Sequence, residues 1–188
     1  MKIWILRITA FVLLVSGSFL LADGCWIRAK AVLAQILLQH AWEQTLATGE
    51  QTKAWHWADT WPVARLQVER LGIDLIVLEG ESGEVLAFGP GHLPGSSVPG
   101  SEGHCIVAGH RDTSFHFLQD LIKNDVLILQ ISDGTEQRYN IRETMVHGAN
   151  DLYFRESDSS SLTLLTCYPF ESLAVNTTLR YIVFAERS

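Results

Sequence analysis

A cysteine at the end of an apolar run is the residue of this chain best suited to covalent chemistry. Residues 162–166 have the composition of a buried strand, which ends on Cys167 just before Tyr168 and Pro169. Such an ending places a thiol at a loop edge. A thiol attacks only as its thiolate, so it needs a base or a cation nearby. The pattern predicts a nucleophilic cysteine, provided that such partners lie close.

Two residues elsewhere in the chain are candidate partners of this thiol. His110 follows one predicted strand, and Arg180 opens another at residues 179–185. If the latter strand neighbours the one that carries the thiol, Cys167 and Arg180 meet at facing strand ends about 4.8 Å apart. A permanent cation there can stabilise the oxyanion of a tetrahedral intermediate, while a histidine can transfer protons. We therefore predict His110, Cys167 and Arg180 as the catalytic residues of an acyl-transfer site.

Each of these residues also has a structural interpretation. A cysteine in an apolar strand is often a small buried hydrophobe, and His110 and Arg180 are also compatible with ordinary surface positions. Metal binding is the competing use of four residues that lie close in sequence: His104, Cys105, His110 and His116. His104 and Cys105 are adjacent, however, so they point to opposite faces of a strand, and no CxxC or HExxH spacing occurs. A Ser-His-Asp site lacks a GxSxG element. We expect no metal and no cofactor.

The elements that must position these residues are predicted to be strands. Alternating patterns or short apolar runs occur at residues 64–69, 73–78, 85–88, 105–108, 126–131, 137–146, 162–167 and 179–185. Residues 89–100 are rich in Gly and Pro and are expected to form loops or turns, and residues 157–161 a polar loop. Eight short strands with few helices and no βαβ rhythm indicate an all-β domain, a closed or nearly closed barrel.

Length and charge restrict the class of protein further. The 188 residues allow one domain of ordinary size plus an appendage. With 14 basic and 21 acidic side chains the net charge is −7, which argues against a nucleic-acid partner. Three cysteines cannot all pair, so at least one thiol is expected to be free.

The N-terminal segment is long and apolar enough to cross a bilayer. Residues 3–22 carry one charge, Arg7, whose side chain can extend to the headgroups. We predict a membrane anchor over residues 1–24, with a signal segment as the alternative.

The next segment connects this anchor to the strands. Residues 26–46 have apolar side chains at helical spacing and predict a stalk helix. Three tryptophans follow, which we expect to pack on the domain: Trp55, Trp57 and Trp61. The expected organisation is therefore an anchor, a helical stalk with a Trp-rich linker at residues 25–61, and a catalytic domain at residues 62–188.

Together these motifs resemble those of the sortases, which are membrane-anchored cysteine transpeptidases. The match includes Ala-Gly-His-Arg-Asp-Thr at residues 108–113, Leu-Thr-Leu-Leu-Thr-Cys at 162–167 and Arg-Tyr-Ile-Val at 180–183. Gly-Pro-Gly-His at 89–92, followed by Pro-Gly at 99–100, is similar to the sortase stretch before the catalytic histidine.

The chain is still more similar to the sortase class of Gram-negative bacteria, called class GN or marine proteobacterial. The segments that carry this similarity are residues 57–66, 86–92 and 166–170. Sortases of this kind usually have Asn-Thr where this chain has His104-Cys105, which adds a thiol and brings possible oxidation. The loop at residues 171–176 also lacks the glycines often found there.

The resemblance implies an eight-stranded sortase barrel and a thioester mechanism. Cys167 would attack a Thr–Gly-type peptide bond in an LPXTG-like C-terminal sorting signal, and Arg180 would steady the carbonyl and its oxyanion. His110 would protonate the departing amine and deprotonate the incoming one. Thr166, Asp112 and Tyr168 are expected to support the site or bind substrate.

The implied partner is a secreted protein with a C-terminal sorting signal, of the type with VIT and von Willebrand A-type domains. The amine acceptor is left open. The resemblance also implies a single-pass inner-membrane protein with its catalytic domain in the periplasm. Two alternatives remain: a hydrolytic cysteine peptidase, and a catalytically silent barrel that only binds peptides.

Overall fold

The computed structural model describes residues 2–149, 160–172 and 177–188. Most of the predicted polar loop at residues 157–161, and positions 173–176 of the loop after Cys167, lie outside the described residues. The chain divides into two units, residues 1–36 and 37–188. Each unit is described by itself.

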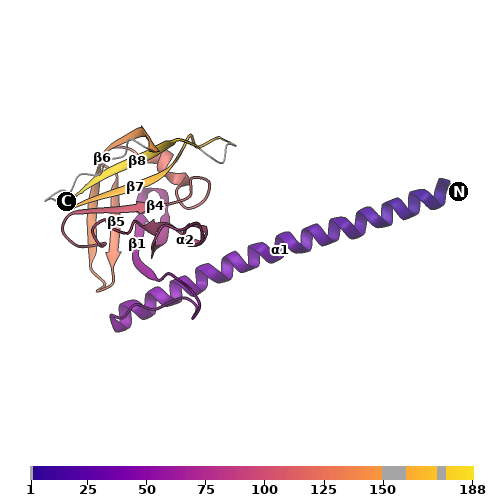
Figure 1. The fold of residues 1–188 in the computed structure, drawn as a ribbon, viewed down its shortest axis with the longest axis horizontal. Helices are drawn as coiled ribbons and strands as arrows, with labels where there is room; N and C mark the ends of the chain where they lie inside the picture. The colour runs from indigo at the N-terminus through magenta and orange to yellow at the C-terminus, as the bar shows by residue number, and fades with distance from the viewer. Residues whose placement is uncertain (1, 150–159, 173–176) are drawn as a thin grey trace. The chain divides into compact units, whose positions relative to one another are not determined.

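The second unit contains a closed barrel of eight strands, which confirms the predicted fold class. The strands follow one another around the barrel in the order β1-β2-β3-β4-β7-β8-β6-β5. Figure 1 shows the barrel with strands β1, β4, β5, β6, β7 and β8 labelled. Their bounds are β1 Pro62–Val68, β2 Ile73–Glu79, β3 Gly91–His92, β4 His104–Ala108, β5 Val126–Ile131, β6 Glu136–Gly148, β7 Ser161–Tyr168 and β8 Leu179–Arg187. Most pairs are antiparallel, but β2–β3 and β4–β7 are parallel. The parallel β4–β7 pair brings the ends of two distant segments to the same rim.

Two local predictions were wrong. Residues 85–88, predicted as a strand, belong to a short helix, α2 (Gly83–Phe88), whose N-cap Ser82 accepts a hydrogen bond from the Val85 amide at 3.3 Å. The eighth strand, β3, lies instead inside the Gly/Pro-rich stretch that was predicted as loop. The missing side chain of Gly91 explains this position, because a Cβ there would lie 2.0 Å from the carbonyl oxygen of Gly80.

Alternation along the strands fills the barrel with apolar side chains. The buried members include Leu66 on β1, Val77 on β2, Leu129 on β5, Leu164 on β7 and Val183 on β8. Among the described residues, the 3₁₀ helices η1 (Glu69–Leu71) and η2 (His116–Asp120) lie in the connections. The η2 helix contributes buried Phe117 and Leu118 to the same core, so the segment after His110 is held by packing.

A single helix, α1 (Lys2–Thr48), spans both the predicted anchor and the predicted stalk. Within the second unit, its Leu38 and Trp42 pack with Ile76, Leu78 and Val85. The Trp42 indole is fully buried and donates a hydrogen bond to Gln130 Oε1 at 3.2 Å. The end of the predicted stalk helix is thus part of the second unit. The proposed domain boundaries themselves stay predictions.

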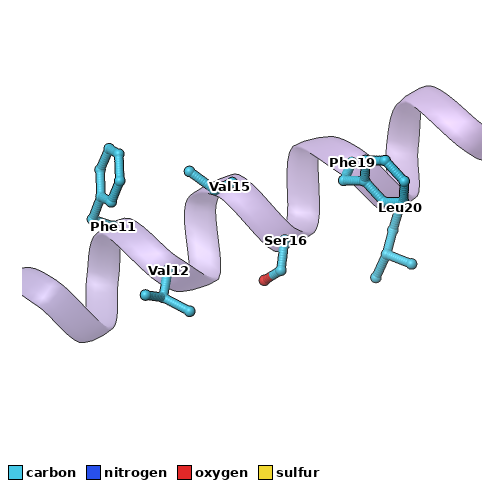
Figure 2. Close-up of a pocket in the computed structure, with 6 residues that line it drawn as sticks. All are labelled: Phe11, Val12, Val15, Ser16, Phe19 and Leu20. Carbon is cyan, nitrogen blue, oxygen red and sulfur yellow. The ribbon is translucent and has the colours of Figure 1, made fainter.

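Over residues Ala10–Thr48, α1 is long and apolar enough to cross a membrane, and residues 10–36 of this stretch belong to the first unit. Figure 2 shows six side chains that project from a short stretch of it: Phe11, Val12, Val15, Ser16, Phe19 and Leu20. The one hydroxyl among them, on Ser16, donates to the Leu13 carbonyl oxygen at 3.1 Å. Because this polar group is satisfied within the helix, the surface is compatible with hydrocarbon.

The three tryptophans of the linker differ in how far they are buried. The Trp55 ring makes an edge contact with Phe88 of α2 at a centroid distance of 5.0 Å, as expected for packing on the domain. Trp61 is half-buried. Trp57 is 70% exposed, so the expectation of packing was wrong for this residue.

Candidate active site

Cys167 and Arg180 are direct partners in the antiparallel β7–β8 pair. Paired residues in such a ladder place their side chains on the same face with Cβ atoms about 5 Å apart. Leu162 and Leu164 of β7 point into the core, and side chains alternate along the strand. Cys167 and Arg180 therefore both face the outside of the barrel, where Cys167 is partly exposed.

His110 reaches the same level from the other side of β7. Each residue of β4 aligns with the residue 57 positions later, from His104 with Ser161 to Ala108 with Leu165. The alignment continues past the end of β4, since the Gly109 amide donates to the Leu165 carbonyl oxygen at 3.0 Å. β4 itself ends at Ala108, and we infer from the same offset, carried two residues further, that His110 lies beside Cys167. The three predicted catalytic residues thus follow one another across adjacent strand ends, with Cys167 in the middle.

Thr166 fastens these two strand ends together. Its buried hydroxyl donates to the Gly109 carbonyl oxygen at 2.7 Å, directly before His110. Gly109 is required there because a Cβ would lie 2.7 Å from the Phe115 ring. Thr166 therefore has a positional role, consistent with the predicted support of the site.

Tyr168 and Asp112 have other surroundings. The Tyr168 ring stacks on Tyr181 of β8 at 6.1 Å with an interplanar angle of 21°, and Phe170 meets both rings edge-on. Asp112 pairs with its neighbour Arg111, whose hydrogen bond and charge lower the pKa of the Asp112 carboxyl, with smaller contributions from His116 and His110. These contacts indicate support of the surrounding loops for both residues.

The sequence did not single out Arg111 as a functional residue. Its guanidinium donates to the carbonyl oxygens of Pro169 and Ser172, each at 2.8 Å, so it joins the loop after His110 to the loop after Cys167. The one signal in the sequence was its place in the Gly-His-Arg-Asp motif. Besides the Asp112 carboxylate, the partners of Arg111 are two backbone carbonyls, which no residue pattern identifies.

His104 and Cys105 point to opposite faces of β4, as expected. The His104 ring makes a hydrogen bond to Thr163 Oγ1 at 2.7 Å, whereas Cys105 is buried in the core. Burial raises the pKa of the Cys105 thiol to about 12, with a smaller contribution from the charge of Glu79. A buried thiol with so high a pKa is poorly reactive, which argues against ready oxidation at this position.

Comparisons with known proteins agree with this geometry. The family model described as the Sortase domain matches residues 66–188. The chain belongs to the sortase family. Sortase D of Bacillus subtilis (strain 168) is 34% identical over 124 residues, which cover 65% of this chain and 62% of that protein. The chain thus aligns with under two thirds of this relative's length.

Solved sortase structures share the fold. Sortase A from Corynebacterium diphtheriae matches with a TM-score of 0.63 and 26% identity, over 70% of this chain and 63% of that one. Sortase C-1 from Actinomyces oris matches with a TM-score of 0.59 and 28% identity, over 68% and 74%. A Clostridium perfringens Sortase D5 transpeptidase matches with a TM-score of 0.67, over 84% of this chain and 99% of that one, and at 21% identity it supports the fold alone.

Proposed function

We propose that this protein is a membrane-anchored cysteine transpeptidase that cleaves an LPXTG-like C-terminal sorting signal and transfers the acyl group to an amine. One observation carries the proposal: Cys167 lies between His110 and Arg180 at adjacent strand ends of one barrel rim. The fold and the family membership agree with it.

In the proposed reaction, the Cys167 thiolate attacks the carbonyl carbon of the scissile peptide bond. The Arg180 guanidinium stabilises the oxyanion that forms, and protonated His110 gives its proton to the departing amine. A thioester then joins the substrate to Cys167. His110, now neutral, takes a proton from the incoming amine as its nitrogen attacks the thioester, and Cys167 leaves as the thiolate.

The surface next to Cys167 suits an apolar peptide. Leu165 and Ile182 are direct partners in the β7–β8 pair, two residues before Cys167 and two after Arg180. Their side chains therefore share the outer face with the catalytic pair. Ile182 is buried and Leu165 is half-buried, so the apolar surface available to a residue of the sorting signal upstream of the scissile bond is that of Leu165.

The finer parts of the proposal concern class, partner and location. The motifs at residues 57–66, 86–92 and 166–170 favour the Gram-negative class. For that class we propose a secreted substrate with VIT and von Willebrand A-type domains. The apolar part of α1 would anchor the protein in the inner membrane with the barrel in the periplasm.

A peptide assay with the full chain in detergent tests the function. An LPXTG-like peptide is incubated with and without glycine-based or alkyl amines, and the products are identified by mass spectrometry. We expect an amine-ligated product that Cys167→Ala abolishes and Arg142→Ala, a change at an exposed ion pair on β6, leaves unchanged. Hydrolysis without ligation would instead favour a cysteine peptidase. No turnover with any sorting-signal peptide would favour a silent binding barrel.

A further inference from the structure

Arg111 occupies an unusual position for an arginine beside a surface histidine. Its side chain is 8% exposed and points under the loop that follows Cys167. Four hydrogen bonds hold the guanidinium: two to the Asp112 carboxylate at 2.7 and 3.0 Å, one to Pro169 O at 2.8 Å and one to Ser172 O at 2.8 Å. Only a planar guanidinium, with N–H donors that point in several directions (the fork), reaches three acceptor groups at once.

These contacts connect the two segments on which the chemistry depends. His110 and Cys167 each stand at the point where a strand gives way to a loop. Before these two residues, hydrogen bonds of Gly109 with Leu165 and Thr166 join the end of β4 to β7. Beyond it, Arg111 provides a further link, since its backbone follows His110 and its side chain binds the chain two and five residues after Cys167.

The charges around the guanidinium suit this role. The hydrogen bond that Arg111 donates to Asp112 is the main cause that raises the pKa of Arg111, and the negative charges of Asp112 and then Cys167 add to it, against a smaller lowering by burial. Asp112 also fixes the orientation of the fork, because it accepts from both Nε and Nη2. The cation therefore stays bound to the two carbonyl oxygens throughout the working pH range.

We propose that Arg111 is a positioning residue that fixes the separation between His110 and Cys167. This inference rests on the proposed function for its catalytic consequence but not for its geometric one. Without the guanidinium of Arg111, the loop after His110 and the loop after Cys167 move independently. His110 is then no longer aligned for proton transfer with the amine of the substrate or acceptor. A displacement of about 1 Å at a catalytic group lowers the rate by about 100-fold.

The geometric part is tested by cross-linking in the full chain in detergent, without any turnover. A C25S background removes the exposed thiol of α1, and H110C then places a second thiol beside Cys167. Dibromobimane becomes fluorescent when it joins two nearby thiols. We expect H110C to cross-link readily and H110C/R111M to do so about tenfold more slowly. The control is H110C/R65M, which breaks a two-bond ion pair with Asp74 on β1–β2, on the opposite side of the barrel. Equal rates with and without R111M would overturn the proposal.

The catalytic part is tested by steady-state kinetics of R111M and R111K with the peptide substrate. We expect kcat to fall about 100-fold in R111M with KM changed by less than about threefold, and R111K to stay close to R111M because an ammonium lacks the fork. An unchanged kcat in R111M, or full recovery in R111K, would contradict a positioning role. If the wild type shows no turnover while cross-linking still depends on Arg111, the proposed function fails and the geometric role stands.

Discussion

Cys167 on β7 and Arg180 on β8 are direct cross-strand partners on the outer face of the barrel. The pairing follows from antiparallel registration along the whole length of both strands, from Ser161 with Glu186 to Tyr168 with Leu179. A one-residue shift in register would move one of the two side chains to the other face. The register thus places the Arg180 side chain on the same face as the thiol, while its guanidinium donates to the carbonyl oxygens of Thr177 and Leu179 at 2.7 and 3.0 Å.

The first prediction concerns this cation. Arg180→Ala should lower kcat for a sorting-signal peptide by about 100- to 1,000-fold, the usual cost of losing an oxyanion donor. Arg180→Lys should recover little of it, because the ammonium group cannot reproduce the guanidinium geometry. Arg142→Ala, on the neighbouring strand β6, serves as the control and should retain wild-type turnover. Equal activity in Arg180→Ala and the control would remove Arg180 from the mechanism.

The second prediction concerns the attachment of the stalk helix to the barrel. Trp42 is fully buried and hydrogen-bonded to Gln130, so Trp42→Ala should lower the free energy of unfolding by about 3–5 kcal/mol. The exposed Trp57 supplies the control, since Trp57→Ala should change it by less than about 0.5 kcal/mol. Denaturant titration of the second unit's fluorescence in the full chain measures both. If Trp42→Ala changed the free energy of unfolding as little as Trp57→Ala, the end of α1 would not contribute to the stability of the barrel.

The third prediction is a pH dependence of stability. Hydrogen bonds from Arg70, and then from the Ile122 amide, lower the pKa of Asp125 in the folded protein. The unfolded chain therefore binds more protons in acid, so this stabilisation is present above the unfolded pKa of about 3.9 and is lost as pH falls through the lower folded value. Asp125→Asn should lower Tm at neutral pH and flatten the loss of Tm below about pH 5. The exposed Asp59→Asn should leave the wild-type profile unchanged, and an unaltered profile in Asp125→Asn would contradict the assignment.

The fourth prediction concerns the different reactivities of Cys105 and Cys167, the two cysteines of the second unit. Burial raises the pKa of the Cys105 thiol to about 12, whereas Cys167 is partly exposed. In a C25S background, iodoacetamide at neutral pH should label Cys167 and leave Cys105 unmodified until the protein is unfolded. Peptide mapping by mass spectrometry gives the ratio of labelled Cys167 to labelled Cys105. Labelling of native Cys105 at a rate similar to Cys167 would show that the core opens at β4.

Much of the barrel was predictable because its long strands carry strong local patterns. Residues 126–131 coincide with β5, and the runs that carry Cys167 and Arg180 begin and end within two residues of β7 and β8. The errors lie where the elements are short. Four apolar residues at 85–88 cannot reveal whether their period is that of a strand or a helix. The two-residue strand β3 exists only through its pairing with β2 and β4.

The site was partly predictable for a similar reason. The Cys167–Arg180 pairing needed only the assumption that their strands are neighbours, and His110 followed from its own strand end. The contacts of Arg111 with the loop after Cys167 were not predictable, because the acceptors there are backbone oxygens 58 and 61 residues further along the chain. The burial of Cys105 likewise depends on which face of β4 meets the core.

The most direct test of the central claim is the mass of the acyl-enzyme. The full chain in detergent is mixed with an LPXTG-like peptide, quenched in acid and digested for mass spectrometry. We predict a thioester-linked substrate fragment on Cys167 that hydroxylamine removes and that is absent from Cys167→Ala. An adduct that persists in Cys167→Ala, or peptide cleavage at the wild-type rate in that variant, would contradict the assignment of Cys167 as the nucleophile.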